Sequence, residues 1–149
     1  MSTLASCTVC LTFGWLVLRA GSASASETFV LIRNSENPTS TLSQKQLRAM
    51  AVGEVKEWDQ AGPLQWVVLE EPGADIEWLA REVFGIPAAA LRRKMKLEVF
   101  RGELRPPRTA SSEAEVIDKV RHNRGALALV SSETSKALPE GVATIQLTD

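Results

Sequence analysis

The chain has 149 residues, of which 17 are basic and 18 acidic, and its formal net charge is −1 at pH 7. This near balance excludes a polycation that binds nucleic acid through its overall charge. The length fits one domain of ordinary size, and the 44% of apolar residues is enough to build its core.

The first 25 residues differ in composition from the rest and predict an export signal. Residues 8–18 form an almost purely apolar run, shorter than the roughly 20 residues that a membrane-spanning helix needs. The segment Ala23-Ser24-Ala25 has the form that signal peptidase accepts. We therefore expect a signal peptide over residues 1–25, and a periplasmic or otherwise extracytoplasmic domain over residues 26–149 with no stable membrane span. An uncleaved anchor is the alternative, because no Lys or Arg precedes the apolar run.

In the mature chain, short apolar runs alternate with helical patterns. Residues 29–33 (FVLIR) predict a buried strand, followed by a polar loop. Ser43 and Gln46 have the spacing of a capping box, in which each side chain accepts a hydrogen bond from the other residue's backbone N–H. They predict the start of a short helix that ends near Gly53. Residues 64–69 (LQWVVL) predict the second strand.

Two helices are predicted between the second and third strands. The first follows a turn at residues 70–73, carries apolar residues at helical spacing and stops at Gly85. Its apolar positions are Ile76, Leu79, Ala80, Val83 and Phe84. The second helix spans roughly residues 88–101 and ends at Gly102, with Leu91, Met95 and Val99 or Phe100 facing inward.

The last third of the chain predicts one more helix and two strands. Ser112 and Glu115 have the spacing of a second capping box, before a helix that residues 123–125 close. Residues 126–130 predict a buried third strand, and residues 142–147 a fourth, for which an edge position is one option. This alternation predicts an α/β fold with a largely parallel sheet flanked by helices. In such sheets ligands bind at the carboxyl ends of the strands, near helix N-termini.

Five polar residues are candidates for a small anion-binding site. Arg33, Asn34 and Ser35 follow the first strand, and Ser43 and Ser112 stand at predicted helix starts. Hydroxyl and backbone N–H groups at such positions can hold an oxyanion. The alternative is that both serines only cap their helices.

Two ordered sets of residues lie within residues 29–131. The first set is Leu42, Ser43, Leu47, Gly53, Trp58, Gly62 and Leu64. The second set is Phe100, Arg101, Gly102, Pro106, Pro107, Ser112, Glu115, Val116, Val120, Gly125 and Ala126. In order and spacing they resemble the substrate-binding proteins of bacterial phosphate ABC transporters. The resemblance implies one lobe of a two-lobed, type II periplasmic-binding-protein fold. It also implies a non-enzymatic solute-binding domain without a cofactor, which binds phosphate or another small oxyanion for uptake or sensing and works with an ABC permease.

The chain departs from this family after the second strand. There the family carries an Arg and a Ser-Gly-Thr loop that hold phosphate, whereas residues 70–75 (EEPGAD) contain no Ser, Thr or Arg. Three carboxylates would face a dianion, and one like-charge contact at 4 Å costs about 4 kcal/mol at an effective dielectric near 20. This departure favours the alternative of a ligand-free interaction module that docks to an envelope partner.

Residues 92–108 form a basic segment, with seven Lys and Arg residues against Glu98 and Glu103. Such a segment attracts an anion or an acidic partner. The alternative is a solvated helix face followed by a charged loop.

Chemical motifs give no support to an enzyme. The only histidine, His122, is predicted in the last turn of a helix, where a cation suits the helix dipole. The sequence contains no nucleophile elbow, P-loop or dinucleotide fingerprint. Cys7 and Cys10 have the spacing of a redox pair or of half a zinc site, but no second ligand pair accompanies them. We therefore expect a binding protein without a metal site.

Overall fold

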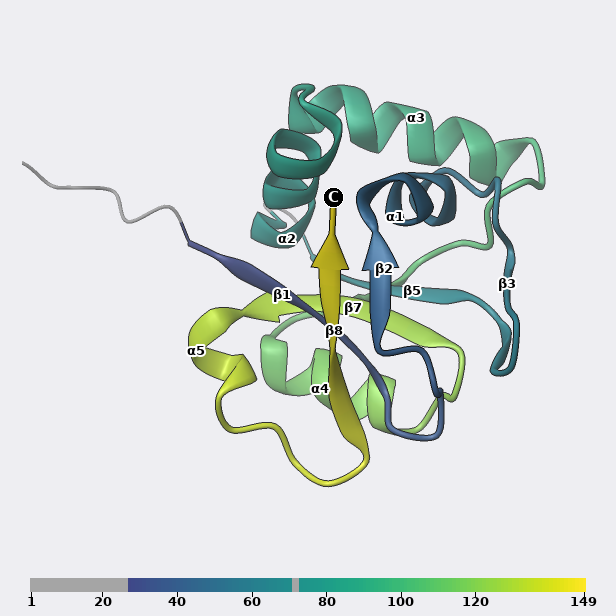
Figure 1. Ribbon diagram of the computed structural model, residues 1–149. Helices are drawn as coiled ribbons and strands as arrows, with labels where there is room; N and C mark the ends of the chain where they lie inside the picture. Colours follow the sequence, from purple (N-terminus) through teal and green to yellow (C-terminus); the bar gives the residue numbers. More distant parts are fainter. Residues whose placement is uncertain (1–26, 71–72) are drawn as a thin grey trace, which may run out of the picture.

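The structure, a computed structural model, describes residues 27–70 and 73–149. At its centre is a six-stranded sheet (Figure 1). In spatial order its strands are β2 (Thr41–Ser43), β8 (Val142–Thr148), β1 (Phe29–Asn34), β7 (Ala126–Ser131), β5 (Gln65–Leu69) and β6 (Arg108–Ala110). The predicted signal peptide lies outside the described residues, and the domain boundary at residue 26 stays a prediction.

The strands of the sheet do not all end on the same side. The pairs β2–β8, β5–β6 and β5–β7 are parallel, whereas β1 runs antiparallel to both β7 and β8. The α/β fold with a mostly parallel sheet is thus confirmed. The other five strands end at one edge, which we call the carboxyl edge. Because β1 is reversed, its last residue lies at the opposite edge, which we call the amino edge.

The predicted fourth strand, β8, is not at an edge of the sheet. It pairs with β1 on one side and with β2 on the other, where Thr41 lies opposite Gln146. The prediction that this strand is the outermost one was wrong, because the three residues before the first helix form β2 and pair alongside it. A strand of three residues is too short to show a period in the sequence.

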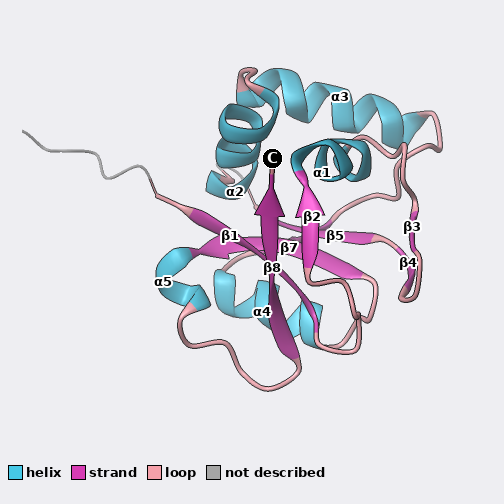
Figure 2. Ribbon diagram, in the orientation of Figure 1, coloured by secondary structure: helices cyan, strands magenta, loops and turns pink. Residues whose placement is uncertain are grey.

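Helices cover both faces of the sheet (Figure 2). One face carries α1 (Gln44–Ala51), α2 (Ala74–Trp78), the π-helical segment η1 (Leu79–Phe84) and α3 (Ala88–Phe100). The other face carries α4 (Glu113–Arg121), with the short α5 (Ser132–Ser135) beside it. A separate hairpin, β3 (Glu57–Trp58) with β4 (Gly62–Pro63), precedes β5. None of the helices in the described ranges is long and apolar enough to cross a membrane.

Local sequence signals explain most helix boundaries. The Ser43 hydroxyl accepts the N–H of Gln46 at 3.1 Å, and the Gln46 side chain accepts the N–H of Ser43 at 2.9 Å. This confirms the capping box that starts α1. The predicted helix before Gly85 is α2 followed by η1, and Gly85 ends it in the left-handed conformation, with φ of 65°.

Two hydrophobic clusters fill the space between the layers. The larger lies under α1, α2, η1 and α3, and the smaller lies under α4. The indole N–H of Trp66 donates to the carbonyl of Met50 at 3.1 Å, and that of Trp58 donates to the carbonyl of Gly125 at 2.9 Å. Both rings are almost fully buried, so these tryptophans hold the core together.

Candidate functional site

The carboxyl edge has four strand-to-helix connections: the direct one from β2 into α1, and three turns that follow β5, β6 and β7. The chain leaves β5 at Leu69, β6 at Ala110 and β7 at Ser131, and it then enters α2, α4 and α5 respectively. Ligands of open α/β sheets bind at this edge, where backbone N–H groups point outward from the turns. The occupancy of those N–H groups therefore decides what the edge can bind.

The described residues on both sides of the turn between β5 and α2 bond to a carboxyl group of the chain itself. Asp75 is 1% exposed, and its two carboxyl oxygens accept the N–H of Leu69 at 2.9 Å and the N–H of Ile76 at 2.8 Å. Burial raises the pKa of Asp75, while these hydrogen bonds and the charge of Arg92 oppose the rise. The sequence predicted that this carboxyl would face a bound dianion, whereas in the structure it points inward.

Arg92, from α3, braces the same turn. Its Nη2 atom donates to the carbonyl of Gly73 at 3.3 Å. Gly73 is tightly enclosed, because a Cβ atom there would lie 3.0 Å from an Asp75 oxygen and 3.2 Å from the Leu69 carbonyl oxygen. The first basic residue of the segment 92–108 is therefore part of the turn's framework.

The turn between β6 and α4 also contains an internal carboxylate. The Ser112 hydroxyl accepts the N–H of Glu115 at 3.2 Å, as a helix cap does. Glu115 does not return the bond to Ser112, as a capping box requires, but accepts the N–H and the hydroxyl of Ser111, both at 2.8 Å. Together with Lys119, 2.8 Å away, these donors lower the pKa of Glu115 to about 2.

The third turn, between β7 and α5, is occupied in the same way. Glu113 accepts the N–H of Ser131 at 2.5 Å and its hydroxyl at 3.0 Å, and it also accepts the hydroxyl of Thr134. All three turns therefore direct backbone N–H groups at a carboxyl group of this chain. No sequence pattern revealed these pairings, because Glu113 and Ser131 are 18 positions apart.

The structure separates the five predicted site residues. Ser43 and Ser112 lie at the carboxyl edge, but Ser43 ends β2 and Ser112 follows β6, which are the two outermost strands of the sheet. Arg33, Asn34 and Ser35 lie at the amino edge. One pocket built from all five is not formed, because β1 runs against its neighbours and carries its last residues to the far edge.

At the amino edge, Asn34 is engaged in structural hydrogen bonds. Its Nδ2 atom donates to the carbonyls of Val120, at 3.1 Å, and Arg121, at 2.8 Å, and so closes the end of α4. Its Oδ1 atom accepts the N–H of Glu36 at 2.8 Å. A hollow of about 180 Å³ next to Ser35 is lined by Arg121, His122 and Arg124 among others.

Arg33 bonds to the loop that follows β1. Its guanidinium donates to the carbonyls of Asn34, at 3.2 Å, and Asn37. Burial lowers its pKa, and its Nε atom has no hydrogen-bond partner among the described residues. Anion binding by Arg33, Asn34 and Ser35 stays a prediction, now confined to the amino edge.

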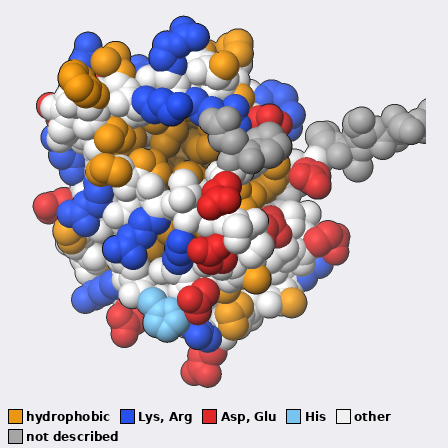
Figure 3. Space-filling model, turned by 180° about the vertical axis from the view of Figure 1, so that it is seen from behind, with side chains coloured by type: hydrophobic (Ala, Val, Ile, Leu, Met, Phe, Trp, Pro, Cys, Tyr) orange, Lys and Arg blue, Asp and Glu red, His pale blue; other side chains and the backbone are white. Residues whose placement is uncertain are grey.

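An apolar hollow of about 330 Å³ opens beside the β5–α2 turn, between α3 and the chain leading into β6. Its apolar lining is Val68, Leu69, Ile76, Met95, Val99, Pro106 and Pro107, and its polar lining is Glu70, Arg92, Lys96 and Thr109. Figure 3 shows this hydrophobic hollow below a rim of Lys and Arg side chains. The sequence did not predict it, because it forms only where α3 crosses the ends of β5 and β6.

α3 also exposes two large apolar side chains. Phe100 is 89% exposed and Leu97 is 44% exposed. The sequence allowed either Val99 or Phe100 to face inward, and the structure turns Val99 toward the core and Phe100 toward solvent. Aromatic side chains such as Phe100 are enriched in protein contact surfaces.

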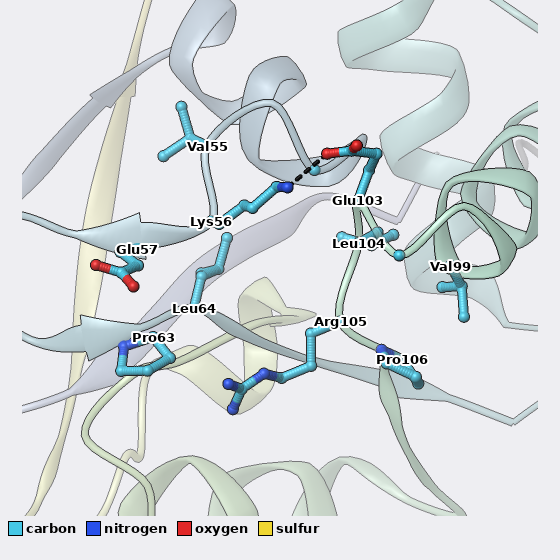
Figure 4. A pocket seen from close by; sticks show the side chains of 12 residues that line it. Val55, Lys56, Glu57, Pro63, Leu64, Val99, Glu103, Leu104, Arg105 and Pro106 are labelled. Atoms are coloured by element: carbon cyan, nitrogen blue, oxygen red, sulfur yellow. Dashed lines mark hydrogen bonds and ion pairs between the residues drawn. The ribbon is translucent and has the colours of Figure 1, made fainter.

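A second cavity, of about 400 Å³, opens near the start of β5 (Figure 4). Lys56 and Glu103 form an ion pair across its wall at 2.5 Å, and Lys56 holds the pKa of Glu103 below its ordinary value. The side chain of Arg105 extends along its floor below Leu64. Because this pair neutralises itself, the remaining charges in the lining are Arg105 and Glu57, which have opposite signs.

Metal ligands do not gather in the described part of the chain, where no group of three His, Cys, Asp or Glu residues could hold an ion. His122 caps the end of α4, and its Nδ1 atom lies 2.8 Å from the carbonyl of Asp118.

Comparison with solved structures identifies the fold. An ABC-type phosphate transport receptor from Vibrio cholerae matches with a TM-score of 0.55 and 18% identity, over 83% of this chain and 48% of that chain. PstS from Borrelia burgdorferi matches with a TM-score of 0.62 and 11% identity, over 83% and 48%. A phosphate-binding protein from Stenotrophomonas maltophilia matches with 0.63 and 13%, over 83% and 39%.

The chain folds like part of a phosphate-binding transport receptor. It spans less than half the length of these three receptors, as the expected single lobe does. No family model matches the sequence, and no curated protein matches it. At this level of identity the likeness establishes the fold, and the ligand has to be argued from the edge itself.

Proposed function

We propose that the chain is a non-enzymatic binding domain with the fold of a solute-binding lobe, which docks to an envelope partner outside the cytoplasm. The observation that carries this proposal is the occupancy of the carboxyl edge. Asp75, Glu115 and Glu113 take up backbone N–H groups of all three turns. A free oxyanion would have to displace a group that is already bonded and would meet its negative charge.

The basic segment supports an anionic partner. Five of its seven cations make no ion pair or hydrogen bond with any described residue, namely Arg93, Lys94, Lys96, Arg105 and Arg108. Uncompensated charges of one sign attract acidic surfaces and speed their association. Arg92 and Arg101 bond within the chain instead.

Calorimetric titration of the purified protein with phosphate, sulfate and molybdate tests the proposal. We expect no saturable heat at micromolar anion, because micromolar affinity requires about 8 kcal/mol and each of the three turns already bonds an N–H group to a carboxyl group of the chain. Saturable binding of phosphate by the unaltered protein would overturn the docking function.

A substitution at the third turn tests the proposal by a gain of phosphate binding. Glu113→Ala frees the N–H and hydroxyl of Ser131 and the hydroxyl of Thr134. We expect this variant to gain weak, saturable phosphate binding that the unaltered protein lacks. The matched control is Glu133→Ala on α5, which removes an exposed carboxylate that pairs only with Lys136. A variant that folds and binds no better than the control would show that the carboxylate does not occupy an anion position.

The second candidate is a solute-binding lobe for phosphate or another small oxyanion, serving uptake or sensing with an ABC permease. The fold likeness to phosphate-binding receptors favours it. In that case the anion would bind at the amino edge, beside Arg33, Asn34 and Ser35, or at the unpaired cations of the basic segment. Replacing Arg33 by Gln would weaken phosphate binding at the first place, and replacing both Arg93 and Lys96 by Gln would weaken it at the second. Replacing Lys45 on α1 would change neither.

A further inference from the structure

We propose that one side of α3, together with the apolar hollow beside it, is the docking surface for an acidic amphipathic segment of a partner protein. We call this surface the α3 face and define it by Arg93, Lys96, Leu97 and Phe100, with the adjoining hollow. The inference rests on the proposed function and names the chemistry of the partner.

Helical spacing places these four residues together. Lys96, Leu97 and Phe100 lie three, four and seven residues after Arg93, so all four residues are on one side of the helix. All four are exposed. Lys96 belongs to both parts of the surface, because it also lines the hollow. The α3 face is therefore continuous from the hollow, across Lys96, to Phe100.

The apolar parts of the face are suited to a partner's side chains. Phe100, 89% exposed, is a projecting anchor of the kind that dominates protein interfaces. The hollow of about 330 Å³ is a complementary receptacle for an aliphatic or aromatic side chain. A partner segment could therefore insert a side chain into the hollow and receive Phe100 between its own side chains.

The charges select the sign of the partner. Neither Arg93 nor Lys96 makes an ion pair or a hydrogen bond with a described residue. A segment with carboxylates flanking its apolar side chains would neutralise both. Arg92 is excluded from this role because it braces the β5–α2 turn through the carbonyl of Gly73.

The shape favours a protein segment over a bilayer or a second copy. A membrane surface reaches Phe100 and Leu97 but leaves the recessed hollow unfilled. A symmetric pair of chains would bring Arg93 and Lys96 of both copies into one interface without adding a carboxylate to the α3 face, which is repulsive. A separate acidic segment meets neither obstacle.

Paired synthetic peptides test the inference. Each has 18 residues and forms a helix with Leu and Phe on one side; one carries Glu at the remaining positions and the other carries Lys. Binding to the purified protein is followed by titration in two-dimensional NMR, which reports the amides that shift. We expect the Glu peptide to bind at least tenfold more tightly than the Lys peptide, with shifts confined to α3 and residues 106–109.

Substitutions on α3 separate the face from the rest of the helix. We expect Phe100→Ser and Lys96→Glu each to weaken binding of the Glu peptide at least fivefold, with an unchanged urea midpoint because both side chains are exposed. The matched control is Lys94→Glu, an identical charge change on another side of the same helix. If Lys94→Glu weakens binding of the Glu peptide as much as Lys96→Glu does, the loss comes from the overall charge of the protein. The assignment of the α3 face is then overturned.

Three results would overturn the inference in distinct ways. Equal binding of both peptides, or shifts away from α3, rules out an acidic docking segment there. Binding to phosphatidylglycerol vesicles that Phe100→Ser abolishes, without peptide binding, assigns the face to a membrane. A dimer seen by light scattering that Phe100→Ser dissociates assigns it to a second copy. Phosphate calorimetry is independent of all three and decides the proposed function by itself.

Discussion

At Gly125 the β3–β4 hairpin and the central sheet come into close backbone contact. Gly125 lies just before β7, and its carbonyl accepts the indole N–H of Trp58 and the backbone N–H of Gln65, both at 2.9 Å. A Cβ atom at this position would lie 1.9 Å from the carbonyl oxygen of Pro63. The substitution Gly125→Ala therefore forces two backbone segments apart.

The cost follows from that distance. Real Cβ contacts essentially never come under 3.0 Å, so the segments must separate by more than 1 Å. Overpacking of this kind costs about 1–3 kcal/mol, and a buried indole N–H that loses its acceptor costs about 1–3 kcal/mol more. We expect Gly125→Ala to lower the free energy of unfolding by about 2–6 kcal/mol, out of the roughly 5–15 kcal/mol typical of a domain.

Urea unfolding followed by tryptophan fluorescence measures the loss. The control is Gly102→Ala, where a Cβ meets open space and the cost comes only from a φ of 78°, about 1–2 kcal/mol. If Gly125→Ala loses no more stability than Gly102→Ala, the close approach of the hairpin does not hold the fold together and the reasoning is refuted.

Three further predictions address a titration, a cap and the leader. The folded-state pKa of Glu115, about 2, lies below its ordinary value of 4.5, so its stabilising contribution is present above pH 4.5 and is lost as the pH falls through about 2. Glu115→Gln should flatten that part of the curve of urea midpoint against pH, whereas Glu140→Gln should leave it unaltered. Ser43→Ala removes the α1 cap and should cost about 1 kcal/mol in urea unfolding; no loss would mean that Gln46 alone suffices. Mass spectrometry of the exported protein should find Ser26 as the first residue, and an intact N-terminus would support an uncleaved anchor.

The sequence predicted the elements better than their arrangement. Strands β1, β5 and β7 and the cap of α1 followed from short-range patterns, because apolar runs and Ser43 act through neighbouring residues. The π-helical turns of η1 were missed because Leu79, Ala80 and Val83 suit an α-helix equally well. β2 and β6 were missed because strands of three residues are too short to establish a period.

The candidate site depended on information that no single segment contains. Placing Arg33 and Asn34 at the ligand side assumed that β1 is parallel to its neighbours, and its direction is fixed only by pairing with β7 and β8. The bonds from the turns to carboxyl groups of the same chain were also not predictable from the sequence. Asp75 could be predicted to lie in its turn, but its inward orientation depends on the N–H groups that converge there.

The carboxylates of the three turns have one more consequence. A tethered group cannot diffuse away, and its effective concentration exceeds the millimolar range of a flexible linker because the fold holds it in place. On the proposed function, we therefore expect the N–H groups bonded to Asp75, Glu113 and Glu115 to stay closed to dissolved phosphate, so that docking would not depend on the phosphate concentration.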